Sequence, residues 1–309
     1  MSVRGVSPID VEHLGHAGVI CAYLLEAPSP TLVDPGPSTS LDRLIAGLTR
    51  LGVDVQDLRD ILLTHIHLDH AGAVGQLVRE NPHITVHVHA DGAPHLADPA
   101  RLVSSTRRTF GDDHDRYWGE VFPVPADRIR AWAPGDPPPL ENVRPIPTPG
   151  HIAHHLAWEA SGPGIVFSGD SLGVVLSPGA PAHPPTPPPA VDLSAWRATF
   201  ETFRHEVEAP FFAATHFGIH PDPSGRTLEL ADGLEDLARR VHGALEAGEE
   251  AEAEAFEAFA RETLARQGFG REGKQSATDY FSVFPPRLDW AGMRFHLSRT
   301  PAERERLGA

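Results

Sequence analysis

The sequence predicts an α/β fold with a core to about residue 220, a helical insert in it at about 92–134, and a helical extension at 221–309. Two observations predict this division. Up to residue 220, short apolar runs bounded by Gly, Pro or Asp alternate with segments of helical spacing. Beyond Pro221 the apolar residues keep helical spacing only, and the chain becomes acidic. We therefore expect two parts that differ in secondary structure.

The individual elements follow from apolar spacing and from turn residues. Strands are predicted at 18–26, 31–34, 59–64, 84–89, 143–146, 155–159, 164–168 and 210–215. Helices are predicted at 41–51, 71–80 and 193–206, and two or three short helices are expected within the insert. The Pro-rich segment 177–190 predicts an extended loop. In the extension, Leu230, Leu234 and Leu237 begin one amphipathic face, and Phe256 and Phe259 begin a second.

Composition excludes several classes of function. The chain carries 26 Lys and Arg against 42 Asp and Glu, and Lys274 is its one lysine. Binding to a nucleic-acid backbone needs clustered basic residues, so no nucleic-acid partner is expected. The sequence has no run of about 18 apolar residues, so no membrane span is expected. The N-terminus lacks the apolar segment of a secretory signal, which predicts a cytoplasmic protein.

The stretch ILLTHIHLDHAGA, residues 61–73, places four metal-binding side chains directly after an apolar strand. In an extended segment, residues two apart point the same way, so His65 and His67 can hold one ion. Asp69 and His70 follow where the chain turns into a helix, and they face a neighbouring point. Imidazole and carboxylate ligands in this pattern suit two divalent metal ions, of which zinc is expected, with iron or manganese as alternatives.

Two metal sites need further ligands, and candidates stand at three other strand ends. They are His151 in TPGH, Asp170 in FSGD and His216 in ATHFG. Together with THIHLDHAG, these motifs resemble the metallo-β-lactamase superfamily of metal-dependent hydrolases over roughly residues 18–218. All the expected ligand positions are present and in order. The resemblance implies a four-layer αββα sandwich, with two mixed sheets face to face, helices outside and metals at one edge.

The resemblance also implies roles for individual residues. By position it assigns the first metal to His65, His67 and His151, the second to Asp69, His70 and His216, and a bridging role to Asp170. Asp34 in LVDPG matches an aspartate that orients a ligand histidine. The implied chemistry is attack by a metal-bridging hydroxide on a carbonyl, with Asp69 steering the hydroxide and helping to move a proton. His16, Tyr117 and Trp118 are candidates for the wall of the substrate pocket, because loops and inserted helices line the cleft in enzymes of this type.

The substrate class can be narrowed further. RNA- and DNA-processing members of the superfamily bind a polyanion, for which this acidic chain lacks a basic surface. The motif set is shared with thioester hydrolases resembling glyoxalase II and with lactone hydrolases. The extension of glyoxalase II-like enzymes presents basic groups to glutathione, whereas here residues 249–257 are acidic and the basic groups are limited to Arg261, Arg266, Arg271 and Lys274. We therefore expect a dinuclear hydrolase that cleaves an ester, thioester or lactone bond of a small molecule.

Two other functions stay open at this point. By resemblance, a mononuclear iron enzyme of the persulfide dioxygenase type would use His65, His151 and Asp170 alone as ligands. A non-catalytic metal-binding protein is the second alternative. The C-terminal helices either pack against the cleft or form a homodimer interface, and an exposed leucine face would favour the homodimer.

Overall fold

The computed structural model describes residues 1–309 except 27–28, 178, 269 and 309, and it describes the backbone alone of 270–274. The chain divides into two compact units. The sheet unit comprises Met1–Pro147, His154–Gly169 and Glu208–Pro221, and the helical unit comprises Thr148–Ala153, Asp170–Val207 and Asp222–Ala309. The domain boundary expected after residue 220 stays a prediction. Within the described part of the chain, every helix is too short or too polar to cross a membrane.

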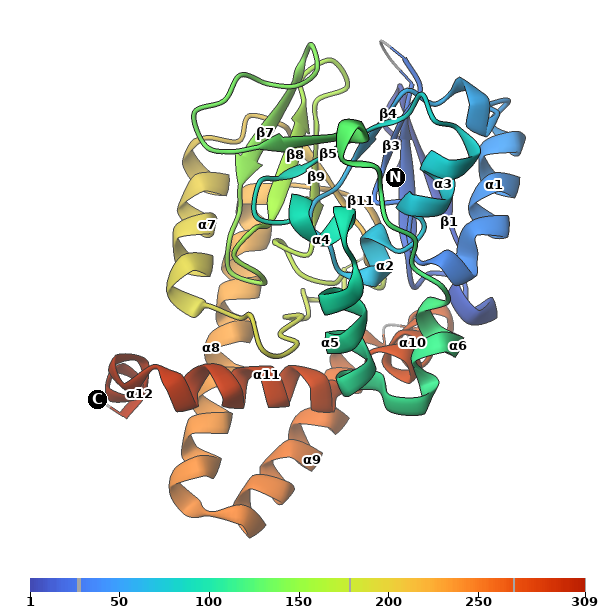
Figure 1. Cartoon of the computed structure of the whole chain (residues 1–309). Coiled ribbons are helices and arrows are strands. Elements are labelled where there is room, and N and C mark those ends of the chain that lie inside the picture. Colours follow the sequence, from blue (N-terminus) through green and yellow to red (C-terminus); the bar gives the residue numbers. More distant parts are fainter. Residues whose placement is uncertain (27–28, 178, 269, 309) are drawn as a thin grey trace. The chain divides into compact units, whose positions relative to one another are not determined.

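The sheet unit contains two mixed sheets, as the resemblance implies (Figure 1). The first has the order β1 (Val6–Asp10), β2 (Cys21–Leu25), β3 (Thr31–Val33), β4 (Asp60–Leu62), β5 (Thr85–His89) and β6 (Ile129–Trp132). Its first three strands are antiparallel and the rest run parallel. The second has the order β11 (Gly218–Pro221), β10 (Phe211–Ala214), β9 (Ile165–Gly169), β8 (Leu156–Ala160) and β7 (Val143–Pro147). Only its β9 and β10 are parallel.

One apolar core joins the two sheets. Tyr23 and Cys21 of β2 belong to the same buried cluster as Trp158 of β8 and Phe167 of β9. The Tyr23 hydroxyl also donates a hydrogen bond of 2.6 Å to the carbonyl of Ala214 at the end of β10. Burial raises the pKa of the Cys21 thiol to about 12, so this cysteine acts as a small apolar core residue. The face-to-face packing of mixed sheets confirms the predicted fold class.

Helices of the sheet unit are α1 (Leu41–Arg50), α2 (Leu68–Ala71), α3 (Val74–Glu80), α4 (Ala93–Ala97), α5 (Ala100–Phe110) and α6 (His114–Trp118). Helix α1 packs closely on β1, because a Cβ at Gly47 would lie 2.3 Å from a methyl carbon of Ile9. The insert contains three short helices, α4 to α6, as expected. The prediction that the insert contains helices alone was wrong near the end of the insert, where β6 pairs in parallel with β5. The IRAW run of β6 is too short to show a strand period, and only the long-range pairing defines it.

The helical unit consists of α7 (Leu193–His205), α8 (Pro223–Ala247), α9 (Glu249–Gln267), α10 (Gly270–Val283), α11 (Pro286–Arg299) and α12 (Pro301–Gly308). Leu230, Leu234 and Leu237 of α8 are buried in a core with Trp196 of α7 and Met293 of α11. The leucine face that would favour a homodimer is therefore covered within the unit itself. A homodimer stays a prediction that would need another surface.

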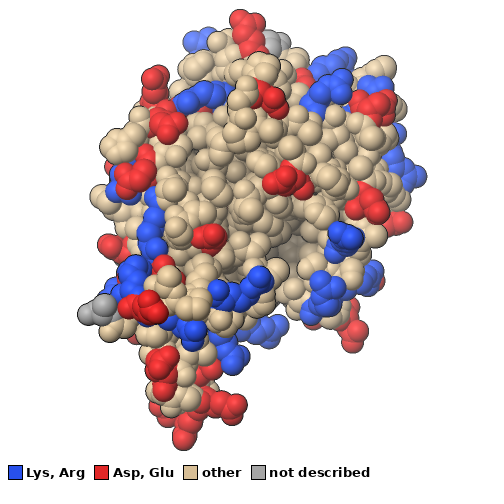
Figure 2. Space-filling view, turned by 60° about the vertical axis from the view of Figure 1, so that its left-hand side comes forward, with Lys and Arg blue, Asp and Glu red and all other residues tan. Residues whose placement is uncertain are grey.

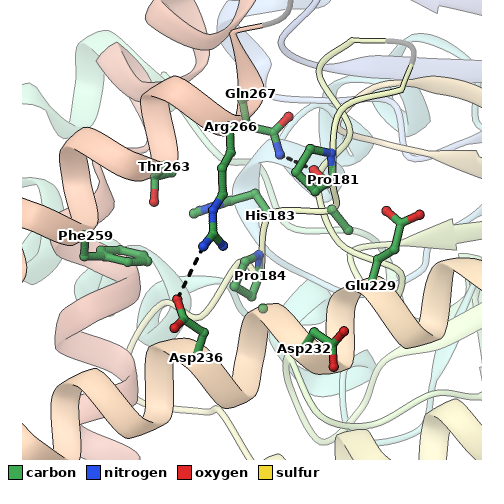
Figure 3. A pocket seen from close by; sticks show the side chains of 12 residues that line it. Pro181, His183, Pro184, Glu229, Asp232, Asp236, Phe259, Thr263, Arg266 and Gln267 are labelled. Atoms are coloured by element: carbon green, nitrogen blue, oxygen red, sulfur yellow. Dashed lines mark hydrogen bonds and ion pairs between the residues drawn. The ribbon is translucent and has the colours of Figure 1, made fainter.

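The helical unit also contains a cavity of about 470 Å³ between α8 and α9 (Figure 3). In Figure 3 the guanidinium of Arg266 reaches toward the carboxylate of Asp236, at 3.9 Å, beside the ring of Phe259. Glu229 and Asp232 line the same cavity, so acidic side chains outnumber Arg266 among its charged lining residues. On the face shown in Figure 2, basic and acidic side chains are interspersed, and acidic side chains gather at the lower tip.

Candidate metal centre

Asp34 lies at the carboxyl end of β3 and accepts hydrogen bonds from three segments of the sheet unit. Its Oδ1 accepts from the backbone N–H of Thr64 at 2.9 Å, and its Oδ2 accepts from the Thr64 hydroxyl at 2.7 Å. The same Oδ2 accepts from the Thr215 hydroxyl at 2.9 Å and lies 2.8 Å from Nδ1 of His70. Asp34 is 1% exposed, so these donors replace water around a buried carboxylate.

Thr64 and Thr215 are functional candidates that the sequence interpretation missed. Each stands directly before a predicted ligand histidine, in the dipeptides Thr64-His65 and Thr215-His216. Both hydroxyls donate to the one carboxylate of Asp34. The repeated Thr-His pair at two strand ends was the signal that could have identified them.

His70 and His216 are held in the same manner, with one ring nitrogen on an acceptor and the other toward Asp69. Nδ1 of His70 donates to Asp34, and its Nε2 lies 3.5 Å from Oδ2 of Asp69. Nδ1 of His216 donates to the carbonyl of Val19 at 2.7 Å, and its Nε2 lies 3.2 Å from the same Oδ2. One ligand atom from each of Asp69, His70 and His216 falls within 4.8 Å of the others.

This group of Asp69, His70 and His216 fits a cation. Because each Nδ1 carries the ring proton, each Nε2 presents a lone pair, and the carboxylate oxygen of Asp69 is an acceptor too. Facing acceptors repel one another unless a proton or a metal ion lies between them. Two ligands of a tetrahedral zinc ion lie roughly 3.4 Å apart, from Zn–N distances near 2.1 Å.

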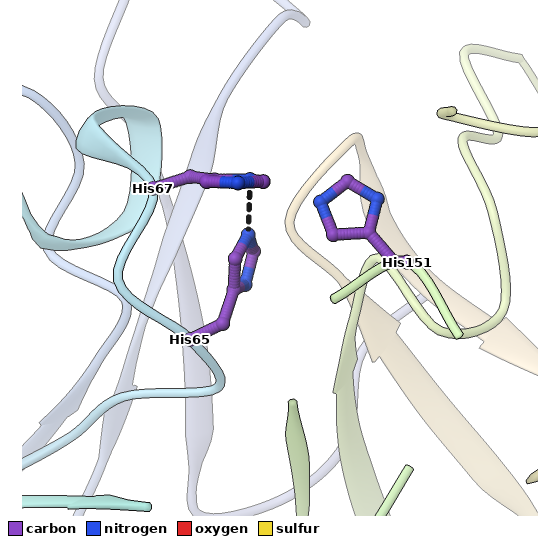
Figure 4. A group of neighbouring side chains, drawn as sticks. All are labelled: His65, His67 and His151. Carbon is purple, nitrogen blue, oxygen red and sulfur yellow. Dashed lines mark hydrogen bonds between the residues drawn. The ribbon is translucent and has the colours of Figure 1, made fainter. Parts of the chain in front are cut away.

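His65 and His67 form a second pair, directly after β4. The Thr64 hydroxyl gives its single proton to Asp34, so the Nδ1–H of His65 donates to Thr64 Oγ1 at 3.2 Å. Nε2 of His65 therefore presents its lone pair, and it lies 2.9 Å from Nδ1 of His67 (Figure 4). The two nitrogens are close enough to serve one ion, in line with the spacing of the two residues in the sequence.

His151 and Asp170 form a pair of the same kind within the helical unit. Nδ1 of His151 donates to the carbonyl of Pro185 at 2.8 Å, and its Nε2 lies 3.3 Å from Oδ2 of Asp170. Again two acceptors face each other at the separation of two ligands on one ion. The TPGH turn depends on glycine, because Gly150 has φ 145 and a Cβ there would lie 2.4 Å from the side chain of Trp196.

Close packing holds the ring of His65 in place. The ring of His155 stacks on it, with centroids 5.0 Å apart and planes at 28°. Gly169, at the end of β9, has φ 50, and a Cβ there would lie 2.5 Å from Thr64 Oγ1 and 2.7 Å from Nε2 of His155. Only a glycine at this position leaves room for both side chains.

The residues predicted to line a substrate pocket differ in exposure. His16 and Tyr117 are half-buried, whereas Trp118 is 2% exposed and stacks on His13 with centroids 5.5 Å apart. Trp118 thus packs within the sheet unit, and the pocket role of all three residues stays a prediction. His13 was passed over in the sequence interpretation, although it stands three residues before His16 in the same HLGH turn.

The chain matches the family model described as the Metallo-beta-lactamase superfamily over residues 22–216. Among the chain's relatives, Probable metallo-hydrolase YqjP of Bacillus subtilis is 29% identical over 136 residues, which cover 42% of this chain and 39% of that protein. Metallo-beta-lactamase fold-containing protein ST1585 of Sulfurisphaera tokodaii is 26% identical over 206 residues, which cover 65% of this chain and 71% of that protein. For YqjP and for two fungal lactamase-like proteins, notP and GME11357, the matched part is less than half of the relative's length.

Solved structures share the fold. The crystal structure of ST1585 superimposes with a TM-score of 0.61 at 24% identity, covering 75% of this chain and 87% of that chain. The structure of TTHA1623, described in a di-iron-bound form, gives a TM-score of 0.50 at 24% identity, covering 66% of this chain and 91% of that chain. At these identities the likeness establishes the fold alone.

Proposed function

Because the chain belongs to the metallo-beta-lactamase superfamily, we propose that it is a dinuclear metal-dependent hydrolase that cleaves an ester, thioester or lactone bond of a small molecule. The observation that carries the proposal is the recurrence of imidazole–carboxylate pairs in which both facing atoms are acceptors. His70 and His216 face Asp69 in this way, and His151 faces Asp170. Such pairs repel unless a cation is held between them.

The proposed ligand assignment is the one that the motifs imply. In this assignment His65, His67 and His151 would hold one ion, Asp69, His70 and His216 would hold the second, and Asp170 would be a ligand shared by both. The inclusion of His151 and Asp170 in the same centre rests on the sequence motifs. When bound, two divalent ions supply a hydroxide nucleophile near neutral pH and positive charge for the developing oxyanion.

The protein's own contribution is to hold the ligand atoms still. Asp34 accepts Nδ1–H of His70, and the Val19 carbonyl accepts Nδ1–H of His216. Each contact fixes the tautomer and the ring orientation, so that Nε2 faces the ion. Asp69 is the candidate for steering the nucleophile and moving a proton, since its carboxylate is buried, anionic and directed at both imidazoles.

The charge of the helical unit favours a neutral substrate. Arg266 is 3.9 Å from Asp236, and Arg261 is 3.2 Å from Glu257, so both basic groups already have acidic partners. The side chains of Arg271 and Lys274 lie outside the described residues. A lactone or simple ester needs no basic clamp, whereas an anionic glutathione thioester does. We therefore place lactones and neutral esters first in the proposed substrate class.

The alternative with a single iron ion makes a different use of the ligands. It needs His65, His151 and Asp170 and leaves Asp69, His70 and His216 without a metal. Their ligand atoms nevertheless lie within 4.8 Å of one another, which supports two ions over one. The metal itself stays open between zinc, iron and manganese, and the di-iron form of TTHA1623 is a reason to include iron in the tests.

Metal content measured together with activity tests the proposal. We expect two equivalents of a divalent metal per chain and metal-dependent turnover within a panel of lactones, esters, thioesters and phosphodiesters. Asp170→Ala and His67→Ala are expected to abolish both metal loading and hydrolysis. His205→Ala is the matched control, because His205 lies exposed on α7, 73% accessible, and pairs with Glu201 of the same helix. One equivalent of iron with oxygen consumption, or turnover of phosphodiesters alone, would contradict the proposal.

A further inference from the structure

The cavity between α8 and α9 of the helical unit has the size of a small-molecule site (Figure 3). Its volume of about 470 Å³ falls within the roughly 300–1,000 Å³ that ligand pockets occupy. The wall consists of residues of α8, of α9 and of the loop 181–184 within the Pro-rich segment. The described residues that line the cavity include no predicted metal ligand, so the proposed function leaves it without a role.

His183 lies in the wall of this cavity and is held by a buried carboxylate. Its ring nitrogen Nε2 donates a hydrogen bond of 2.8 Å to Oδ2 of Asp289. The ring stacks loosely on Phe259, which lines the same cavity, with centroids 6.4 Å apart and planes at 30°. Because the contact with Asp289 fixes the proton on Nε2, the neutral ring presents a lone pair at Nδ1.

Two polar atoms in the wall have no hydrogen-bond partner in the part of the chain that the structure describes. They are Nδ1 of His183 and the hydroxyl of Thr263, and the two residues are 4% and 5% exposed. Both atoms nevertheless keep some accessible surface, whereas a third unpaired acceptor, Oε1 of Gln267, is enclosed in the same wall. Nearly buried polar atoms in native structures bond to water or to a ligand, so Nδ1 and the hydroxyl are candidate acceptors for a ligand's donors.

Three carboxylates also line the cavity, and one of them lacks a basic partner. Glu229 pairs with Arg226 at 2.6 Å, and Asp236 pairs with Arg240 at 2.9 Å. Asp232 forms no ion pair with any residue that the structure describes. A positively charged ligand would therefore find one carboxylate free to compensate its charge.

The remaining charges exclude an anion, and the geometry disfavours a metal ion. Arg266 lines the cavity, but its guanidinium lies 3.9 Å from Asp236 and 3.8 Å from Glu262, so carboxylates already balance its charge. An anionic ligand would meet an excess of negative charge here. Among the described residues of the cavity, no three metal-binding atoms lie close together, unlike those of the candidate metal centre. An organic cation fits these observations.

We propose that this cavity is a second ligand site, which binds a small organic cation through its ammonium group. An ammonium has three N–H donors and no acceptor, which suits a wall of acceptors. Nδ1 of His183 and the hydroxyl of Thr263 accept hydrogen bonds from it, the carboxylate of Asp232 compensates its charge, and Phe259 offers an aromatic ring. Asp289 is a positioning residue, because it acts through His183.

A ligand-observed NMR titration of the metal-loaded protein with butylammonium tests the site, with butan-1-ol as the neutral analogue of the same length. We expect saturable binding of butylammonium with a Kd of about 1 mM, and at least about 10-fold weaker binding of butan-1-ol. Asp232→Asn, Thr263→Val and His183→Phe are each expected to raise the Kd about 10-fold. Glu246→Gln is the matched control and is expected to keep the wild-type Kd, because Glu246 is an exposed carboxylate of α8 outside the cavity.

Two of the variants keep the test decisive if His183→Phe, which leaves Asp289 without its partner, fails to fold. Asp232 is exposed, and Thr263→Val is nearly isosteric, so both variants are expected to retain the wild-type circular dichroism and metal content. Absence of saturable butylammonium binding, equal binding of butan-1-ol, or an unchanged Kd in both Asp232→Asn and Thr263→Val would overturn the inference. The readout is binding and not turnover, so a failure of the proposed hydrolase function would leave the site standing.

Discussion

The carboxylate of Asp34 lies 2.8 Å from Nδ1 of His70, and both side chains are buried. Asp34 stands at the end of β3, whereas His70 belongs to α2, which follows β4. The contact fixes the proton of His70 on Nδ1 and leaves Nε2 for a ligand role. One aspartate outside the predicted ligand set therefore determines the orientation of a residue within it.

Replacement of Asp34 is expected to weaken metal binding while the ligands themselves remain. Asp34→Asn places an amide NH₂ among four donor groups, so His70 loses its acceptor or its tautomer. We expect metal affinity to fall about 10- to 100-fold, measured by competition with a chromophoric chelator. Asp60→Asn is the matched control, because Asp60 makes a similar contact of 2.7 Å with His87 at the other end of β4. Equal metal affinity in wild type and Asp34→Asn would argue against the orienting role.

Removal of one ligand of the second group is expected to release one ion. In the proposed assignment, His216→Ala removes one of four protein ligands of the second ion and leaves Asp69, His70 and the shared Asp170, so this ion is expected to bind more weakly. We expect the metal content to fall from two equivalents to about one and kcat to fall by at least about 100-fold. The measurement is metal analysis after dialysis against a weak chelator, alongside His205→Ala. Retention of both equivalents in His216→Ala would contradict the ligand assignment.

Gly169 is expected to tolerate no side chain. Gly169→Ala would bring a Cβ to 2.5 Å from Thr64 Oγ1, in a backbone conformation of φ 50. We expect the free energy of unfolding to fall by about 2–4 kcal/mol and metal affinity to fall with it, because Thr64 and His155 must move. Gly162→Ala, where no atom lies within 4 Å of the added Cβ, is the control for chemical denaturation. Similar denaturation midpoints for the two variants would disprove the packing argument.

The buried His13 is expected to make the protein sensitive to acid. Burial lowers its pKa from 6.5 to about 4, so the unfolded chain binds a proton that the folded chain does not. The free energy of unfolding therefore falls as the pH drops through the window from 6.5 to about 4, by about 3 kcal/mol in total. Urea denaturation of metal-free protein is expected to show a flatter pH profile for His13→Phe across this window. Parallel profiles for wild type and variant would contradict the expectation.

Asp289 of the helical unit is expected to matter for stability and not for metal binding. Its carboxylate lies 2.8 Å from Nε2 of His183 and accepts from the N–H of Thr186 at 2.7 Å, with all three residues buried. Asp289→Ala would leave two buried donors unpaired, and we expect a loss of about 2–4 kcal/mol in the free energy of unfolding. Metal content per folded chain is expected to stay at the wild-type value. A stable Asp289→Ala variant with reduced metal content would contradict the expectation that Asp289 affects stability and not metal binding.

Most of the fold could be predicted because most strands and helices show a local pattern of apolar and turn residues in the sequence. The strands at 31–34, 84–89 and 164–168 were confirmed as β3, β5 and β9 within one or two residues, since each is an apolar run bounded by turn residues. The strands β1, β6 and β11 were not predicted. β1 contains Pro8 and is defined by its antiparallel pairing with β2, and β6 is defined by its pairing with β5. Pairing between segments that are distant in the chain produces no periodic pattern in the sequence of either strand.

The sequence by itself determined which residues are candidates for the metal ligands, because each stands where an apolar strand ends in a small-residue turn. Only the tertiary structure decided how those side chains are oriented. Asp34 and Thr215 are 181 residues apart, yet their side chains lie 2.9 Å from each other, and the stacking of His13 on Trp118 joins the first turn to the insert. Hydrogen bonds and ring contacts of this kind depend on how strands and helices pack, and a local sequence pattern reports only on residues a few positions apart.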